Sequence, residues 1–123
     1  MGKLTAGPKN SPHTFGVQLL STAEFRARRK WDELELNQAI QRSTIFVIRQ
    51  NEIDQIPDFL AEELLIRAGV EGVCKVLAPL GAGSKLQFFA TPKVSLNRRT
   101  PLQCLANGEL AVVLVAAEGF VER

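Results

Sequence analysis

The chain has 123 residues, of which 46% are hydrophobic and 23% are charged. These proportions exclude wholesale disorder and allow one compact domain or two very small units that share a core. The net charge of +2 is unevenly placed, because residues 1–31 hold six basic and one acidic side chains while residues 32–71 hold three basic and nine acidic ones. The basic front section favours an anionic partner, whereas the acidic middle argues against a surface that is basic all over.

Cysteine use and hydropathy predict a cytoplasmic protein. Cys74 and Cys104 each lie in an apolar helical pattern and form no close pair, so we expect two buried thiols in a reducing compartment and no zinc site. No apolar run approaches the ~20 residues that span a bilayer. The polar start of the chain lacks the apolar segment of a signal peptide. We therefore expect no contact with a membrane.

A tail and a short helix are predicted at the front of the chain. Residues 1–14 are rich in glycine and proline and are expected to be flexible. Ser21 and Glu24 have the spacing of a capping box, which predicts a helix over residues 22–29. Trp31 follows in a brief turn, where we expect it to anchor the turn or the core.

A second helix and a hairpin are predicted next. Asp32 is a favourable N-cap for a helix that runs to about Arg42. The inward stripe of this helix has the spacing i, i+3, i+4 and consists of Leu36, Ala39 and Ile40. Residues 45–48 form a β-rich run, and a polar turn separates them from a weaker strand at residues 53–56.

The rest of the chain is predicted to be helical. Residues 58–77 carry a broad apolar face, which Gly69 and Gly72 weaken or break. Ser84 is expected to cap a further short helix. Thr100 caps the next helix, which has proline in its first turn and ends at Gly108. A last helix is expected over residues 109–120.

Groups suited to catalysis are scarce. The single histidine, His13, lies in the expected tail, and the chain has no tyrosine. The carboxylate clusters fit helix starts or solvated faces. Residues 81–85 resemble a phosphate-binding loop only weakly, because Ser84 precedes Lys85 and the glycines are too close together. We predict no catalytic residue, cofactor or metal site.

The order of elements in residues 21–56 is that of a winged helix-turn-helix, in which the second helix enters the DNA major groove. Four cations in five residues lie beside the turn, and amide side chains follow in the second helix. The residues predicted to bind double-stranded DNA are Arg26, Arg28, Arg29, Lys30, Asn37, Gln38, Gln41, Arg42 and Arg49.

A second hypothesis starts from the acidic side chains of the same helix. Asp32, Glu33 and Glu35 would be repelled by phosphates, and a run of cations is often only a solvated helix end. The alternative function is therefore a protein–protein interaction module that has a winged-helix shape but does not bind DNA.

Residues 19–57 resemble a winged helix of the MerR or excisionase type. The motifs that carry this resemblance are LSTAEF at residues 20–25, RKW at residues 29–31 and the hairpin. The chain departs from that pattern in the second wing strand, where DQIP stands at residues 54–57 in place of the usual aromatic residues.

A second resemblance covers about a third of the chain. The sequence PKVSLNRR at residues 92–99, TPLQCLANG at residues 100–108 and the apolar helix after them are similar to the toxin-binding domain of Xre/MbcA/ParS-type antitoxins. The resemblance implies a transcriptional regulator whose front unit binds DNA and whose last helices dimerise and contact a toxin protein.

The last helix favours binding independently, because it is apolar over nearly its whole circumference and needs cover from this chain or another. We predict a homodimer. The residues predicted to bind a partner are Arg98, Arg99, Leu110, Val113, Leu114 and Ala117. The expected fold is mainly α with a small β-hairpin: a tail at residues 1–14, a winged unit at 15–57 and a helical bundle at 58–123.

Overall fold

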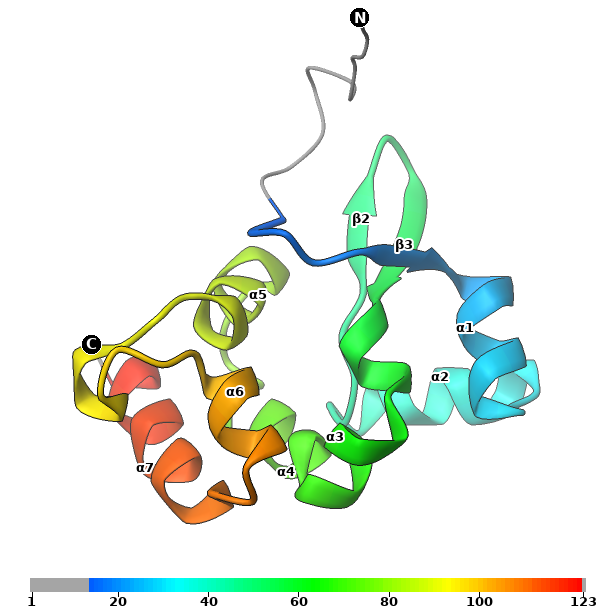
Figure 1. Cartoon of the computed structure of the whole chain (residues 1–123). Coiled ribbons are helices and arrows are strands. Elements are labelled where there is room, and N and C mark those ends of the chain that lie inside the picture. The colour runs from blue at the N-terminus through cyan, green and yellow to red at the C-terminus, as the bar shows by residue number, and fades with distance from the viewer. Residues whose placement is uncertain (1–13, 123) are drawn as a thin grey trace, which may run out of the picture.

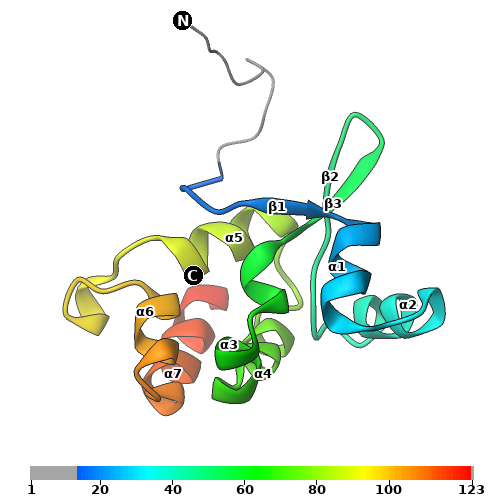
Figure 2. The same ribbon diagram turned by 45° about the vertical axis from the view of Figure 1, so that its right-hand side comes forward.

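The computed structural model describes residues 14–122. In this range the protein is mainly helical with one small antiparallel sheet of three strands, which confirms the predicted fold class in its broad form. Figures 1 and 2 place α1 (Thr22–Arg29) and α2 (Glu33–Gln41) at one side, and α6 (Pro101–Ala106) and α7 (Leu110–Val121) at the other. The predicted tail lies outside the described residues except for Thr14, which opens a turn by accepting a hydrogen bond from the Val17 amide at 2.9 Å.

Both front helices begin at the predicted caps. Ser21 Oγ accepts the Glu24 amide at 3.0 Å, but the Glu24 carboxylate lies 3.6 Å from Arg28. In α2 the capping box is complete: Asp32 accepts the Glu35 amide at 2.8 Å, and Glu35 accepts the Asp32 amide at 2.9 Å. The first turn of α2 is therefore stabilised by hydrogen bonds between residues of that same turn.

The sheet differs from the prediction in two ways. A strand that was not predicted, β1 (Leu19–Ser21), pairs with β3 (Ile53–Pro57), which also pairs with β2 (Ile48–Gln50), so the strand order is β1-β3-β2. The first hairpin strand begins at Ile48, later than predicted, and Ile45 and Phe46 lie in the core ahead of it. Two residues with left-handed backbones, Asn51 and Glu52, close the hairpin.

Glycine divides the predicted long helix. The 3-10 helix η1 (Asp58–Ala61) leads into α3 (Glu63–Ala68) and α4 (Val70–Val76). The break falls at Gly69, whose φ of 102° is a left-handed conformation, while Gly72 is accommodated inside α4. A β-carbon at Gly69 would lie 2.8 Å from Leu110 Cδ2, so the glycine also lets α7 approach.

The later helices confirm one predicted cap and correct another. The predicted Ser84 cap is wrong: α5 (Ala82–Ala90) starts after Gly81, and Ser84 lies inside its first turn. Thr100 does cap α6, and Gln103 completes a capping box that was not predicted. The 3-10 helix η2 (Val94–Leu96) connects α5 to α6.

Residues from before and after residue 57 share one hydrophobic core. Phe46 stacks on Phe89 of α5 at a centroid distance of 6.3 Å, and Phe59 of η1 lies 5.0 Å from Phe89. These rings bring the hairpin entry, η1 and α5 together, so the front elements are not packed independently of the later helices.

Cys74 and Cys104 are buried and unbonded to each other, as predicted. Burial raises the pKa of the Cys74 thiol to about 12, which keeps it protonated at neutral pH. Within residues 14–122 no helix has the length and hydropathy needed to cross a membrane.

Candidate nucleic-acid interface

The turn between α1 and α2 is compact and fixed by the backbone. Lys30 ends α1 in a left-handed conformation with φ of 57°, and the Trp31 amide donates to the Arg26 carbonyl at 3.0 Å. The Trp31 ring meets Phe25 edge to face at 5.7 Å. Trp31 thus has the anchoring position that was expected for it, and α2 leaves the turn in a defined direction.

Arg29 is not available to bind phosphate, which corrects the prediction for this residue. Its guanidinium carbon lies 4.0 Å from the centre of the Trp31 ring. One terminal nitrogen donates to the Leu60 carbonyl and the other to Glu71 of α4, both at 2.9 Å. The side chain is only 12% exposed. Arg29 therefore connects the front helices to η1 and α4.

The other predicted cations remain nearer to solvent. Arg28 is half exposed beside Glu24, and Arg26 is partly buried with its Nε 3.4 Å from the Trp31 carbonyl. Arg49 forms a two-pronged ion pair with Asp54 across the hairpin, which holds the pKa of the Asp54 carboxyl below its usual range. A phosphate would have to compete with Asp54 for Arg49.

Lys30 and Arg42 lie at opposite ends of the α2 segment. Both side chains are exposed, Lys30 at the turn that precedes the helix and Arg42 at its C-cap. They are the predicted phosphate ligands whose positions suit that role best, because cations at the two ends of a helix can reach the two sides of a groove.

The outward face of α2 carries a leucine and two amides. Leu34, Asn37 and Gln41 are spaced i, i+3, i+7, which places them on one side of a helix, and all three are exposed. The opposite side buries Leu36 and Ala39 in the core. Asn37 and Gln41 were predicted to face DNA, and Leu34, which was not predicted, lies on the same side of the helix, as its place off the buried stripe would allow.

Gln38 is placed differently from the other two predicted amides. It is half-buried and lines a pocket of about 250 Å³ beside Trp31, Thr44 and Glu71. Of the acidic residues, Glu35 is engaged in the cap, whereas Glu33 is exposed four positions before Asn37 and therefore borders the outward face. Only Glu35 is thus less opposed to a nucleic acid than its sequence position suggested.

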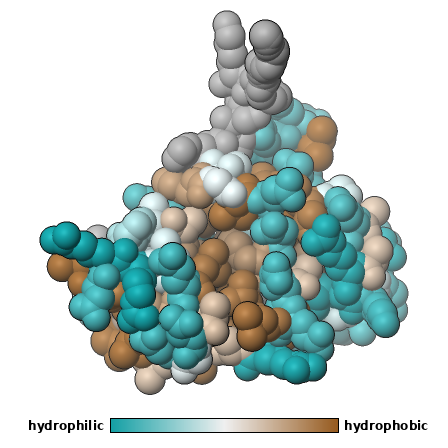
Figure 3. Space-filling view, in the orientation of Figure 1, coloured by the Kyte–Doolittle hydropathy of each residue, from teal (hydrophilic) through white to brown (hydrophobic). Residues whose placement is uncertain are grey.

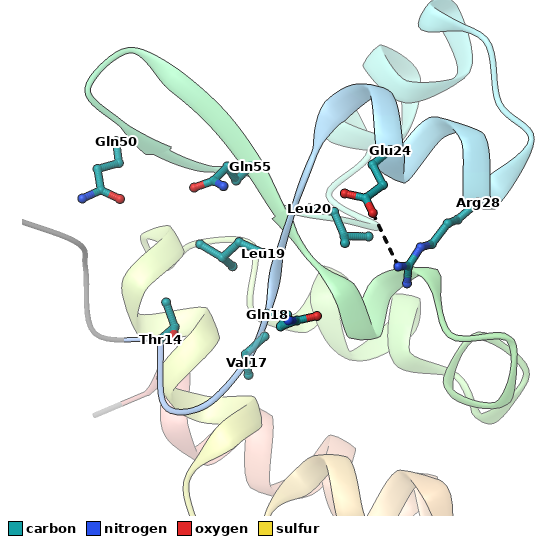
Figure 4. Close-up of a pocket in the computed structure, with 9 residues that line it drawn as sticks. All are labelled: Thr14, Val17, Gln18, Leu19, Leu20, Glu24, Arg28, Gln50 and Gln55. Carbon is teal, nitrogen blue, oxygen red and sulfur yellow. Dashed lines mark ion pairs between the residues drawn. The ribbon is translucent and has the colours of Figure 1, made fainter. Parts of the chain in front are cut away.

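A second polar hollow lies between β1, the start of α1 and the hairpin. It has a volume of about 470 Å³, and Figure 4 shows Gln18, Gln50 and Gln55 around it with the pair of Glu24 and Arg28 at one side. The lining side chains named for this hollow offer amides, a hydroxyl and one ion pair, and no histidine or cysteine is among them. It provides hydrogen-bonding groups rather than a nucleophile.

Two predicted partner contacts on α7 are internal, which is a correction. Val113 and Ala117 are fully buried because α7 packs them against α4 and the adjoining core. Leu110 and Leu114 are partly buried against the same core. These side chains complete the fold of this chain and leave little surface for a second one.

Arg99 is likewise engaged inside the chain, whereas Arg98 is exposed. Two nitrogens of Arg99 donate to the Glu109 carboxylate at 2.7 and 2.9 Å, and its Nε donates to the Leu96 carbonyl at 3.1 Å. This pairing holds the pKa of the Glu109 carboxyl below its usual range. Arg99 fixes the loop before α6 to the start of α7 and is not placed to bind a partner.

The exposed apolar side chains near η2 and α7 are not the ones that were predicted to bind a partner. Val115 is 68% exposed and Val94 is 85% exposed. A groove of about 310 Å³ lies between η2 and α7, lined by Ser95, Leu96, Ala111, Val112, Val115 and Ala116. In Figure 3 hydrophobic side chains reach the surface at the left edge and lower left, the region of η2 and α7 in Figure 1.

Scans of the chain against protein-family models, curated proteins and solved structures return no match. Among residues 14–122 no group of three or more His, Cys, Asp or Glu side chains is arranged to hold a metal ion.

The position of Arg29 gives a stability prediction. Arg29→Ala leaves Glu71 and the Leu60 carbonyl without their charged donor, so we expect the free energy of unfolding to fall by about 2 kcal/mol. Urea denaturation followed by circular dichroism measures the change. The matched control is Arg28→Ala on the same helix, where an exposed pair is lost and the change should stay within about 0.5 kcal/mol. Equal effects of the two variants would contradict the internal role of Arg29.

Proposed function

We propose that the protein is a DNA-binding transcriptional regulator of antitoxin type, with α2 as the helix that enters the major groove. The observation that carries the proposal is the connection of the front elements. A strand, two helices and a hairpin follow one another, and the second hairpin strand, β3, returns to pair with β1 in the order β1-β3-β2. Such a sheet beside a helix-turn-helix is the arrangement expected of a winged unit.

The chemistry of α2 supports the same function. Its exposed amides, Asn37 and Gln41, are of the type that forms paired hydrogen bonds with adenine in the major groove. Lys30 and Arg42 are exposed at the two ends of the segment and supply phosphate contacts. Arg26, Arg28 and Arg49 remain secondary candidates, because each has a contact with another part of the chain.

The DNA proposal is tested by charge reversal at the two exposed cations. We expect Lys30→Glu and Arg42→Glu each to weaken binding to a labelled duplex about tenfold at low salt, and to lower the slope of log affinity against log salt by about one. Fluorescence anisotropy at several salt concentrations gives both quantities, using a duplex selected by the wild-type protein from a random library.

Arg67→Glu is the matched control for this experiment. Arg67 is an exposed arginine of α3, where it pairs with Glu63, and it lies outside the front helices and the hairpin. Its reversal should leave the affinity nearly unchanged. If no duplex is selected, or if all three variants weaken binding equally, the protein-interaction module without DNA binding becomes the better account.

The C-terminal groove favours a second, compatible activity, which is binding of another chain. The exposed valines Val112 and Val115 line an apolar hollow at the end of the molecule remote from α2, and the exposed Val94 of η2 precedes its lining residue Ser95. Apolar surface of this kind is stabilised by contact with a partner. We propose a second copy of the chain as its occupant, with a toxin protein as the further partner that the resemblance to antitoxins implies.

The dimer is tested at Val115, the more exposed of the two groove valines on α7. Sedimentation velocity should show a dimer for the wild-type protein and a monomer for Val115→Asp, because the carboxylate would be desolvated in the contact. The control is Leu64→Asp, which places the same charge at an exposed leucine of α3 outside the groove. A monomeric wild type, or a dimer that survives Val115→Asp, would rule out this contact.

A further inference from the structure

Leu34 is an exposed apolar side chain on the outward face of α2. It is 64% exposed and is the second residue of the helix, whereas the neighbouring apolar residues Leu36 and Ala39 are buried on the opposite side. Single exposed leucines are common on protein surfaces, so exposure alone carries no weight. The position matters, because Leu34 shares its face with Asn37 and Gln41.

The first turn of a recognition helix is the part that contacts base edges. Leu34 lies in that turn, and the capping box of Asp32 and Glu35 fixes the backbone around it with hydrogen bonds of 2.8 and 2.9 Å. The turn before it is held by Trp31 against Phe25. Leu34 is therefore presented by a defined backbone, so its contact can depend on the identity of the base.

The major groove offers one apolar group, the 5-methyl of thymine. An exposed leucine can bury against that methyl, while amides on the same face pair with adenine. A leucine gains nothing from the polar edges of guanine and cytosine. The set of Leu34, Asn37 and Gln41 is thus complementary to A·T pairs.

We propose that Leu34 determines specificity by contacting the 5-methyl group of a thymine in the major groove. This inference rests on the proposed DNA-binding function and adds the kind of base pair that α2 prefers. The acid at the flank, Glu33, gives the competing chemistry, since a carboxylate accepts a hydrogen bond from the amino group of cytosine. A Glu33 contact would be indifferent to the thymine methyl.

The test uses two forms of one duplex. The wild-type protein first selects a duplex from a random library, and that duplex is then synthesised with thymidine or with deoxyuridine, which lacks the methyl. We expect the wild type to bind the thymidine form about three- to fourfold more tightly, the effect of burying one methyl group. Leu34→Ala should bind the two forms equally, while its circular dichroism spectrum stays unchanged because alanine is a good helix former.

Leu64→Ala is the matched control, since Leu64 is a leucine of α3 with a similar exposure of 60%. It should keep the wild-type preference for thymidine. A duplex that is bound without any preference for the methyl, or a preference that survives Leu34→Ala, overturns the role of Leu34 and leaves the DNA-binding function standing. Failure to select any duplex overturns the DNA-binding function itself.

Discussion

The guanidinium of Arg29 is the contact on which the placement of the front helices depends. It lies over Trp31 in the turn, donates to the Leu60 carbonyl of η1 and pairs with Glu71 of α4. A planar group with several fixed donors can stack and form two hydrogen bonds at once, which a lysine ammonium cannot do in this geometry. The direction in which α2 leaves the turn is thereby tied to the C-terminal half of the molecule.

The basic residues of the front section have two different roles. Arg29 stabilises the fold, while Lys30 and Arg42 remain exposed at the ends of the α2 segment. Two acidic residues are also engaged within the chain, because Glu71 accepts a hydrogen bond from Arg29 and Glu35 accepts one from the Asp32 amide at the cap of α2. What remains on the outward face of α2 is a short surface of Leu34, Asn37 and Gln41, with the exposed carboxylate of Glu33 at its border.

Local sequence signals predicted the structure well where the stabilising contacts are local. The caps at Ser21, Asp32 and Thr100 connect residues three positions apart. Ser21 was predicted from the spacing of a capping box, and Asp32 and Thr100 were predicted from their residue types at the start of a helix. A weakening or break at Gly69 and Gly72 was also expected, and the helix breaks at Gly69, where the left-handed backbone favours glycine. The cap expected at Ser84 failed because the helix begins earlier, and a serine inside a first turn looks the same in sequence as one before it.

Contacts between distant parts of the chain were not predictable from sequence. Strand β1 has three residues and gains its partner only when β3 arrives more than thirty positions later, so no local pattern marks it. Arg29 sits among other cations, and its partners Leu60 and Glu71 are far along the chain. Helix α7 is apolar on nearly all sides, so its sequence could not show that Val113 is buried while Val115 is exposed.

In the proposed function, α2 presents its outward face to DNA while the C-terminal helices stay clear of it. An ¹⁵N NMR titration of the full chain with a selected duplex would locate the bound surface residue by residue. We expect the backbone signals of Lys30, Leu34, Asn37, Gln41 and Arg42 to shift, and those of residues 110–121 to stay in place. Shifts confined to η2 and α7, or no shift at saturating duplex, would contradict it.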